Sequence, residues 1–165
     1  MRYVFPMPEA YMASIIHMLV SGNIFLKIIE VSIIIPILEE ILFRGVILGS
    51  FLRNYSTKKS IIVSSFIFAL LHLNPWGFVS YFCVGIILSW IFLKTNNLIY
   101  CIILHGLVNL WIIIASQCNI IIPGYNDIQN LNQFQPWWFD ILGIVLTIIS
   151  FYAFHRIVQY ENSRN

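Results

Sequence analysis

The feature of this sequence that most constrains its fold is a set of three charged residues inside a membrane-like stretch. Glu39, Glu40 and Arg44 lie within the predominantly apolar run from Ile24 to Leu52. A charged side chain near the middle of a bilayer costs roughly 2.5 to 3.5 kcal/mol on insertion scales, so a membrane helix keeps one for a partner, an ion path or chemistry. The rest of the chain is therefore expected to supply partners for these charges.

The composition places the chain in a membrane. Of its 165 residues, 59% are hydrophobic and only 10% are charged, and the mean hydropathy is +0.85. Such a chain has too few polar groups to cover a soluble globule and too many apolar ones for a disordered protein. The formal net charge of +2 comes from scattered basic residues without a basic run, so we expect the lipid bilayer as a partner and no nucleic acid.

Apolar blocks alternate with short polar breaks along the chain, a pattern typical of an all-α, polytopic transmembrane helix bundle. The predicted helices are Pro8–Gly22, Ile24–Arg53, Ser60–Leu73, Trp76–Leu93, Leu98–Gln117 and Trp137–His155. A span of ~30 Å of hydrocarbon needs about 20 residues, which all blocks except the short first and third meet or nearly meet. We predict about five to six membrane helices in a single integral-membrane domain over residues 1–165, with its core at about 24–117.

The basic residues predict the orientation of this bundle. Arg53, Lys58 and Lys59 lie in one predicted loop and Lys94 in another, whereas the connection from Cys118 to Pro136 contains neither Lys nor Arg. Loops rich in Lys and Arg stay on the cytoplasmic side of a membrane. The chain is therefore expected to be a multi-pass protein of the cell membrane, with these basic loops in the cytoplasm.

Three ionisable residues on different predicted helices lie at one depth. Glu40, His72 and His105 are each roughly 16 to 20 Å in from the nearest basic loop at about 1.5 Å per helical residue. Each shares a helix face with a companion one turn away. The pairs are Glu40 with Arg44, Phe68 with His72, and His105 with Asn109. Three helices are thus expected to present one functional face each at the same level.

Each of these groups also has a purely structural explanation. A membrane His can be an interhelical hydrogen-bond donor, and an i, i+4 Glu–Arg pair can simply neutralise itself. Their coincidence at one depth, with a second carboxylate at Glu39 that Arg44 cannot also neutralise, favours a functional site. Pro36 lies one turn before Glu40 and removes a backbone donor to Ser32, so a kink is expected where the carboxylates begin.

Three motifs follow one another on successive predicted helices: Glu39-Glu40-x-x-x-Arg44, Phe68-x-x-x-His72 and His105-x-x-x-Asn109. In this order, in so hydrophobic a chain, they resemble the signature of the CAAX-protease and bacteriocin-processing (CPBP, or Abi) family of intramembrane proteases. The resemblance covers residues 39–109. It implies an all-helical membrane enzyme that hydrolyses peptide bonds, with relatives that include prenyl-protein endopeptidases and proteins of bacteriocin maturation or self-immunity.

The resemblance also implies catalytic roles for four residues. Glu39 and His72 are expected to activate the attacking water, and His105 and Asn109 to stabilise the oxyanion. This division suits amide hydrolysis, which needs a base for the water, an acid for the leaving amine and donors aimed at the developing negative charge. The side-chain amide of Asn109 is a donor that does not change with pH.

Three further motif residues are expected to support the site rather than to react. Glu40 and Arg44 form a charge pair, so that one carboxylate stays neutralised while Glu39 acts as the base, and Phe68 shares a face with His72. We predict a peptide or protein substrate, with membrane-associated and prenylated proteins among the candidates. The site is expected to open toward the cytoplasm.

Other readings of the same residues stay open. Glu39, His72 and His105 also make a plausible three-ligand catalytic zinc site with an open position, although no HExxH motif occurs. The metal-free glutamate mechanism is favoured and no cofactor is expected. A non-catalytic bacteriocin-immunity or adaptor protein of the same fold is a further alternative. An ion carrier is disfavoured because the sequence lacks the repeated halves common in transporters.

Overall fold

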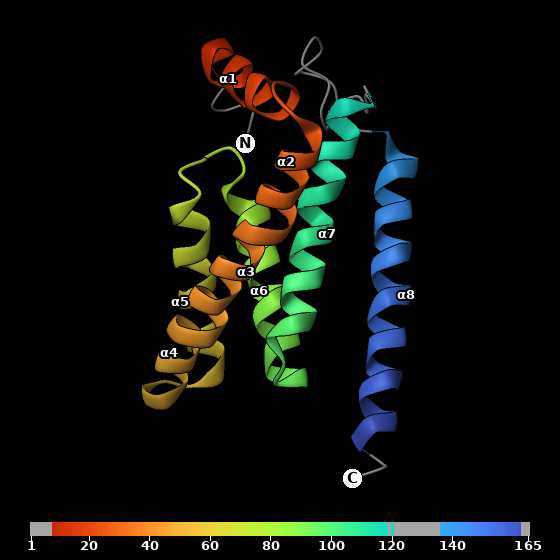
Figure 1. Cartoon of the computed structure of the whole chain (residues 1–165). Helices are drawn as coiled ribbons and strands as arrows, with labels where there is room; N and C mark the ends of the chain where they lie inside the picture. The colour runs from red at the N-terminus through yellow and green to blue at the C-terminus, as the bar shows by residue number, and fades with distance from the viewer. Residues whose placement is uncertain (1–7, 119, 121–135, 163–165) are drawn as a thin grey trace. The chain divides into compact units, whose positions relative to one another are not determined.

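A computed structural model of the protein describes residues 8–118, 120 and 136–162. All regular elements within these ranges are helices (Figure 1). Helices α1 to α7 belong to one compact unit, and α8 (Trp137–Asn162) belongs to a second, so each is described by itself. The single domain predicted for the whole chain stays a prediction, and most of the connection from Cys118 to Pro136 lies outside the described residues.

One continuous helical segment carries the charged motif. It runs from Ile24 to Asn54 and alternates between α and π geometry, in the order α2 (Ile24–Ile29), η1 (Glu30–Ile34), α3 (Ile35–Glu40), η2 (Ile41–Leu48) and α4 (Gly49–Asn54). The sequence predicts this helix to within one residue at its end. It does not predict the two π-helical stretches, whose turns are wider than those of an α-helix. π turns are rare and occur mostly at functional sites.

The first π turn ends at Ile34, two residues before Pro36, which is the second residue of α3. Proline has no backbone N–H and disturbs the hydrogen bonds of the preceding turn. Here the N–H of Ile35 bonds to the carbonyl of Glu30, five residues back instead of four. The helix thus changes from π to α geometry next to Pro36, and the kink expected there stays a prediction.

Three further helices pack around this segment: α5 (Thr57–Leu71), α6 (Phe78–Thr95) and α7 (Leu98–Gln117). Small residues let α5 and α6 approach closely, since a Cβ added at Gly85 would lie only 2.9 Å from the Cβ of Ser65. By length and composition, α6 and α7 could each span a membrane. The prediction of an all-α membrane protein is confirmed, whereas the number of membrane helices stays a prediction.

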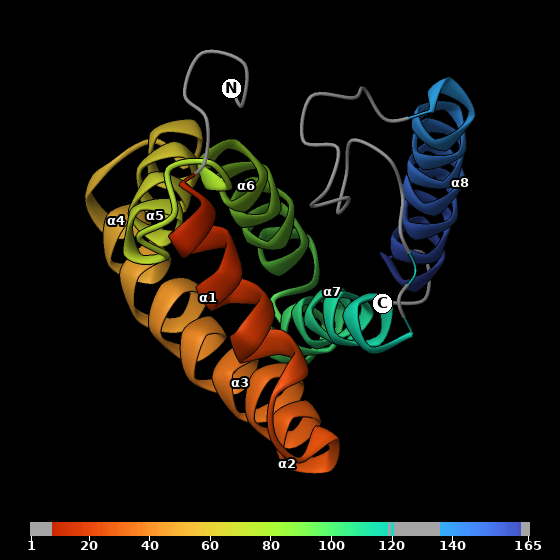
Figure 2. The ribbon, with the colours of Figure 1, turned by 90° about the horizontal axis from the view of Figure 1, so that it is seen from above.

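Helix α1 (Glu9–Val20) does not run alongside the others. Figures 1 and 2 show it lying across the end of the bundle where α2 begins and α5 ends. Gly22, with a φ of +86°, turns the chain from α1 into α2. The ring of Tyr11 on α1 lies 4.9 Å from the ring of Trp76, which precedes α6. The short first block therefore covers one end of the bundle.

Near its middle, the long helical segment turns the Glu40–Arg44 pair inward and Leu38 outward. Glu40 and Arg44 are 0% and 1% exposed, whereas Leu38 is 62% exposed. A helix in water would show the reverse arrangement, but a helix in lipid hides its charges in the bundle. The bundle thus has a polar interior, in which the candidate site lies.

Candidate active site

The centre of the site is a buried ion pair within one helix. The Nη1 atom of Arg44 donates to Oε1 of Glu40 at 2.9 Å, which confirms the predicted i, i+4 pairing. The Nη2 atom donates to the backbone carbonyl of Gly85 on α6 at 3.0 Å. The guanidinium carbon also lies 4.8 Å from the centre of the Phe68 ring, in cation–π range. Arg44 therefore connects the charged helix to both α5 and α6.

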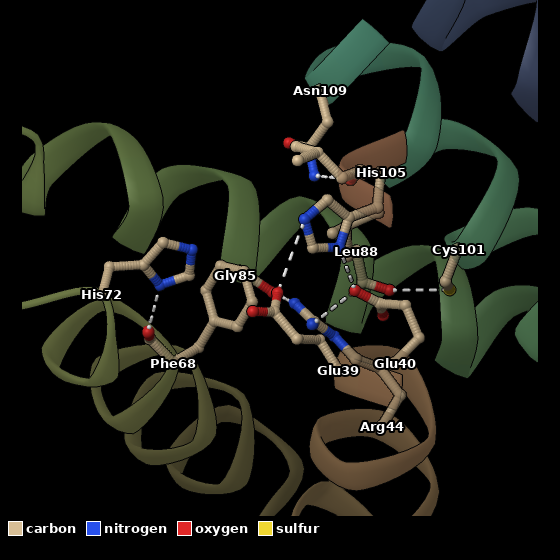
Figure 3. A network of polar contacts seen from close by, with 11 residues as sticks. Glu39, Glu40, Arg44, Phe68, His72, Gly85, Leu88, Cys101, His105 and Asn109 are labelled. Atoms are coloured by element: carbon tan, nitrogen blue, oxygen red, sulfur yellow. Dashed lines mark hydrogen bonds and ion pairs between the residues drawn. The ribbon is translucent and has the colours of Figure 1, made fainter. Parts of the chain in front are cut away.

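His105 of α7 lies between the two carboxylates (Figure 3). Its Nδ1 is 2.8 Å from Oε1 of Glu40, and its Nε2 is 3.6 Å from Oε2 of Glu39. An ionised carboxylate can only accept hydrogen bonds, so Nδ1 carries the proton toward Glu40 and Nε2 faces Glu39. His105 is 4% exposed, whereas 29% of the Glu39 side chain is exposed. One carboxylate is thus enclosed and the other is accessible.

Asn109 lies one turn after His105 on α7 and faces the same helical segment. Its Nδ2 donates to the backbone carbonyl of Val31 in η1 at 2.9 Å. Between these two residues, Gly106 packs directly against the Ser32 carbonyl, and a Cβ there would collide with that oxygen. Close backbone approach at a glycine therefore brings His105 and Asn109 to the charged helix.

His72 lies at the end of α5, on the other side of Phe68 from the ion pair (Figure 3). Its Nδ1 is 2.8 Å from the Phe68 carbonyl, and its ring centre is 4.6 Å from that of Phe68. A carbonyl only accepts, so Nδ1 is the donor and Nε2 is left for other partners. The ring stacks on Tyr81 of α6 at 4.1 Å with an interplanar angle of 23°.

The turn between α5 and α6 holds Tyr81 in place. The Nδ2 atom of Asn74 donates to the Tyr81 hydroxyl at 3.3 Å. The Oδ1 atom of Asn74 accepts from the backbone N–H groups of Trp76 and Gly77, at 3.1 and 3.0 Å. A single Asn side chain thus shapes the turn and contacts the ring on which His72 rests.

Residues 11–111 match the family described as type II CAAX prenyl endopeptidase Rce1-like. This chain belongs to that family. The family predicted from the three motifs is therefore confirmed.

Two curated relatives illustrate the match to this Rce1-like chain. The UPF0177 protein YxdF of Lactococcus lactis subsp. lactis (strain IL1403) is 39% identical over 80 residues, which are 48% of this chain and 44% of the relative. The membrane-embedded CAAX protease MroQ of Staphylococcus aureus (strain USA300) is 36% identical over 108 residues, which are 61% and 43% of the two chains. The chain thus spans less than half the length of these relatives. No solved structure matches it significantly.

In this Rce1-like bundle, the predicted site residues fall into two groups. Glu39, Glu40, Arg44 and His105 contact one another, and the Phe68 ring lies 5.8 Å from that of His105. Within the described part of the chain, His72 makes no hydrogen bond to Glu39 or His105. Glu39 and His105 face each other directly, and the catalytic roles of the four candidates stay a prediction.

Several contacts of the site have no counterpart in the sequence analysis. The carbonyls of Val31 and Gly85 hold Asn109 and Arg44, but a backbone carbonyl exists at every position and gives no signal in a sequence. Gly85 interrupts an apolar helix, which is a signal of close backbone approach. Tyr81 could not be recognised, because its contact with His72 crosses a turn between two helices.

As placed, the three residues of the zinc alternative do not form a ligand set. Glu39 approaches His105, whereas His72 makes no hydrogen bond to either of them within the described part of the chain. Among the residues that the structure describes, no three His, Cys, Asp or Glu side chains are arranged to hold a metal ion. We therefore derive no step through a metal, and independence from metals stays a prediction.

Both carboxylates keep one buried oxygen without a hydrogen-bond partner in the described protein. These atoms are Oε2 of Glu39 and Oε2 of Glu40. Buried polar atoms are nearly always satisfied by protein or by water. Oε2 of Glu39 faces Nε2 of His105 at 3.6 Å. Room for a water molecule at this point stays a prediction.

Proposed function

We propose that this chain is an intramembrane peptidase that hydrolyses a peptide bond with a water activated at Glu39. The observation that carries the proposal is the position of His105, which is held by the enclosed Glu40 and faces the accessible Glu39 at 3.6 Å. A purely structural ion pair would need Glu40 and Arg44 alone. The second, accessible carboxylate next to an oriented imidazole is what general base chemistry requires.

In the proposed reaction Glu39 takes a proton from water. Its side chain is partly exposed and faces His105, and Arg44 is already occupied by Glu40 and the Gly85 carbonyl. Arg44 therefore does not pair with Glu39, and the Glu39 carboxylate stays available as a proton acceptor. His72 assists this step from the far side of Phe68, through the Nε2 that its own backbone contact leaves available.

The oxyanion is stabilised by His105 and Asn109. His105 donates its Nδ1–H to Glu40, which holds the ring with Nε2 toward Glu39 and the reacting atoms. Asn109 uses one amide hydrogen for the Val31 carbonyl and keeps the second for the oxyanion.

The substrate class and topology belong to the same proposal. The substrate is a peptide or protein, and the family description favours a prenylated, membrane-associated one. The chain crosses the membrane several times, with the loops around Lys58 and Lys94 in the cytoplasm, as their basic residues favour. The opening of the site toward the cytoplasm stays a prediction.

Cleavage by the purified chain in liposomes tests the proposal. The probes are a fluorogenic farnesylated peptide ending in a CAAX box and the same peptide without the lipid. Glu39→Gln is expected to abolish cleavage, because the amide keeps the size of the side chain but cannot accept the proton. Asn109→Ala should leave a residue of activity, since losing one oxyanion donor costs on the order of 100- to 1000-fold.

The matched control is Glu30→Gln, which removes an exposed carboxylate from the same helical segment. It should cleave like the wild type. Full cleavage by a folded Glu39→Gln variant would contradict the proposal. If the wild type cuts neither probe, a non-catalytic adaptor or immunity role becomes the better interpretation.

A further inference from the structure

The carbonyl of Val31 is deprived of a main-chain donor by two neighbouring features. In an α-helix it would accept from Ile35, but that N–H bonds to the Glu30 carbonyl in the π turn. In a continued π-helix it would accept from residue 36, which is Pro36 and has no N–H. The wide turn and the proline together therefore leave this carbonyl unpaired within its own helix.

The side chain of Asn109 occupies the position that the helix leaves open. Its Nδ2 donates to the Val31 carbonyl at 2.9 Å from a different helix, and the glycine contact between Gly106 and Ser32 allows this approach. A part-buried carbonyl without a donor is unfavourable, so the contact is favoured. The orientation of the Asn109 amide is thereby coupled to the backbone geometry at Pro36.

We propose that Pro36, by withholding a main-chain donor from the Val31 carbonyl, positions the Asn109 amide for the oxyanion. Pro36 is then a positioning residue that acts through Asn109 and touches no substrate. This inference rests on the proposed function of Asn109. With one amide hydrogen fixed on Val31, the second has a defined direction, whereas an unanchored Asn side chain would sample several rotamers.

Two substitutions at this position distinguish the effect of the missing N–H from the effect of the rigid proline ring. If the π geometry seen at Ile35 continues, the N–H that Pro36→Ala introduces bonds to Val31 rather than to Ser32, and so competes with Asn109 for the Val31 carbonyl. Replacing Pro36 by lactic acid introduces the same methyl side chain through an ester and adds no N–H. We expect the alanine variant to lose up to on the order of 100-fold in cleavage rate, as misplaced catalytic groups do, and the lactic acid variant to stay close to the wild type.

The direct readout is the side-chain amide signal of Asn109 in asparagine-labelled protein, assigned by its disappearance in Asn109→Ala. In the wild type and the lactic acid variant, one amide proton should be protected from solvent exchange. In Pro36→Ala this protection should be lost. An unprotected Asn109 amide in the wild type would overturn the inference even if Pro36→Ala failed to fold, and so would equal losses in both variants.

A double substitution tests whether Pro36 acts through Asn109. In an Asn109→Ala background, Pro36→Ala should cause no additional loss, because the positioned group is already gone. If the losses in cleavage rate of the two single variants multiply in the double variant, Pro36 acts elsewhere and the inference is overturned. Exposed Pro8, at the start of α1, provides the control substitution Pro8→Ala. If Glu39→Gln and Asn109→Ala cleave normally, the proposed function fails, whereas a failure confined to Pro36 leaves that function standing.

Discussion

The two halves of the candidate site are held in place by different forces. On the α3–α7 side, Glu40 accepts from both Arg44 and His105, and all three side chains are almost completely buried. On the α5–α6 side, His72 is half-buried and rests on Tyr81 through ring stacking and on one backbone carbonyl. One half is thus fixed by charge, and the other by aromatic packing.

This difference predicts how each half responds to damage. Removing one partner of a buried ion pair leaves the other charge uncompensated, at a cost of about 3 to 5 kcal/mol. Removing an aromatic partner costs about 0.5 to 1.5 kcal/mol in addition to the contribution of the lost buried area, and the neighbouring ring can reorient. Damage to the first half should therefore appear as lost stability, and damage to the second as lost activity in a folded protein.

The largest effect is expected for Glu40→Gln. The substitution leaves Arg44 and His105 without their shared carboxylate, so thermal unfolding in detergent should show a loss of about 3 to 5 kcal/mol or no folded protein at all. Adding Arg44→Met should restore part of this stability, because an apolar side chain needs no counter-charge. A Glu40→Gln protein as stable as the Glu30→Gln control would contradict the charge-based half of the comparison.

A smaller effect is expected for Tyr81→Leu on the other half. Loss of the stacked ring, worth about 0.5 to 1.5 kcal/mol, should lower the cleavage rate by up to about tenfold while the unfolding midpoint changes little. Tyr81→Phe keeps the ring, loses only the contact with Asn74, and should restore most of the rate. If the phenylalanine variant is as slow as the leucine variant, the hydroxyl rather than the stacking orients His72.

The smallest effect is expected from removing metals. Because the described acids and histidines are not grouped as a metal site, a strong chelator should leave the cleavage rate of the wild type unchanged. Metal analysis of the purified chain should find no stoichiometric zinc. Activity that is lost with the chelator and restored by Zn²⁺ would replace the glutamate mechanism by the zinc alternative, and would require Nε2 of His72 to approach Glu39 and His105.

Local patterns explain what could be predicted without a structure. The helix from Leu98 to Gln117 begins and ends where the apolar block does, and Asn97 caps its first turn with a hydrogen bond of 2.8 Å to the N–H of Ile99. The pairing of Glu40 with Arg44 follows from their spacing on one helix. The two π turns could not be predicted, because a single widened turn changes the apolar pattern of a helix very little.

The sequence by itself determined the helical membrane class, the family and the residues that carry the motifs, because apolar blocks and helical spacing are local properties of the chain. Only the tertiary structure decided which atoms meet. Glu40 holds His105 from another helix, Asn109 is anchored on the carbonyl of Val31, and the ring of Tyr81 supports His72. These contacts depend on how helices distant in the chain pack and on backbone carbonyls that are identical at every position, so no spacing of side chains along the sequence can specify them.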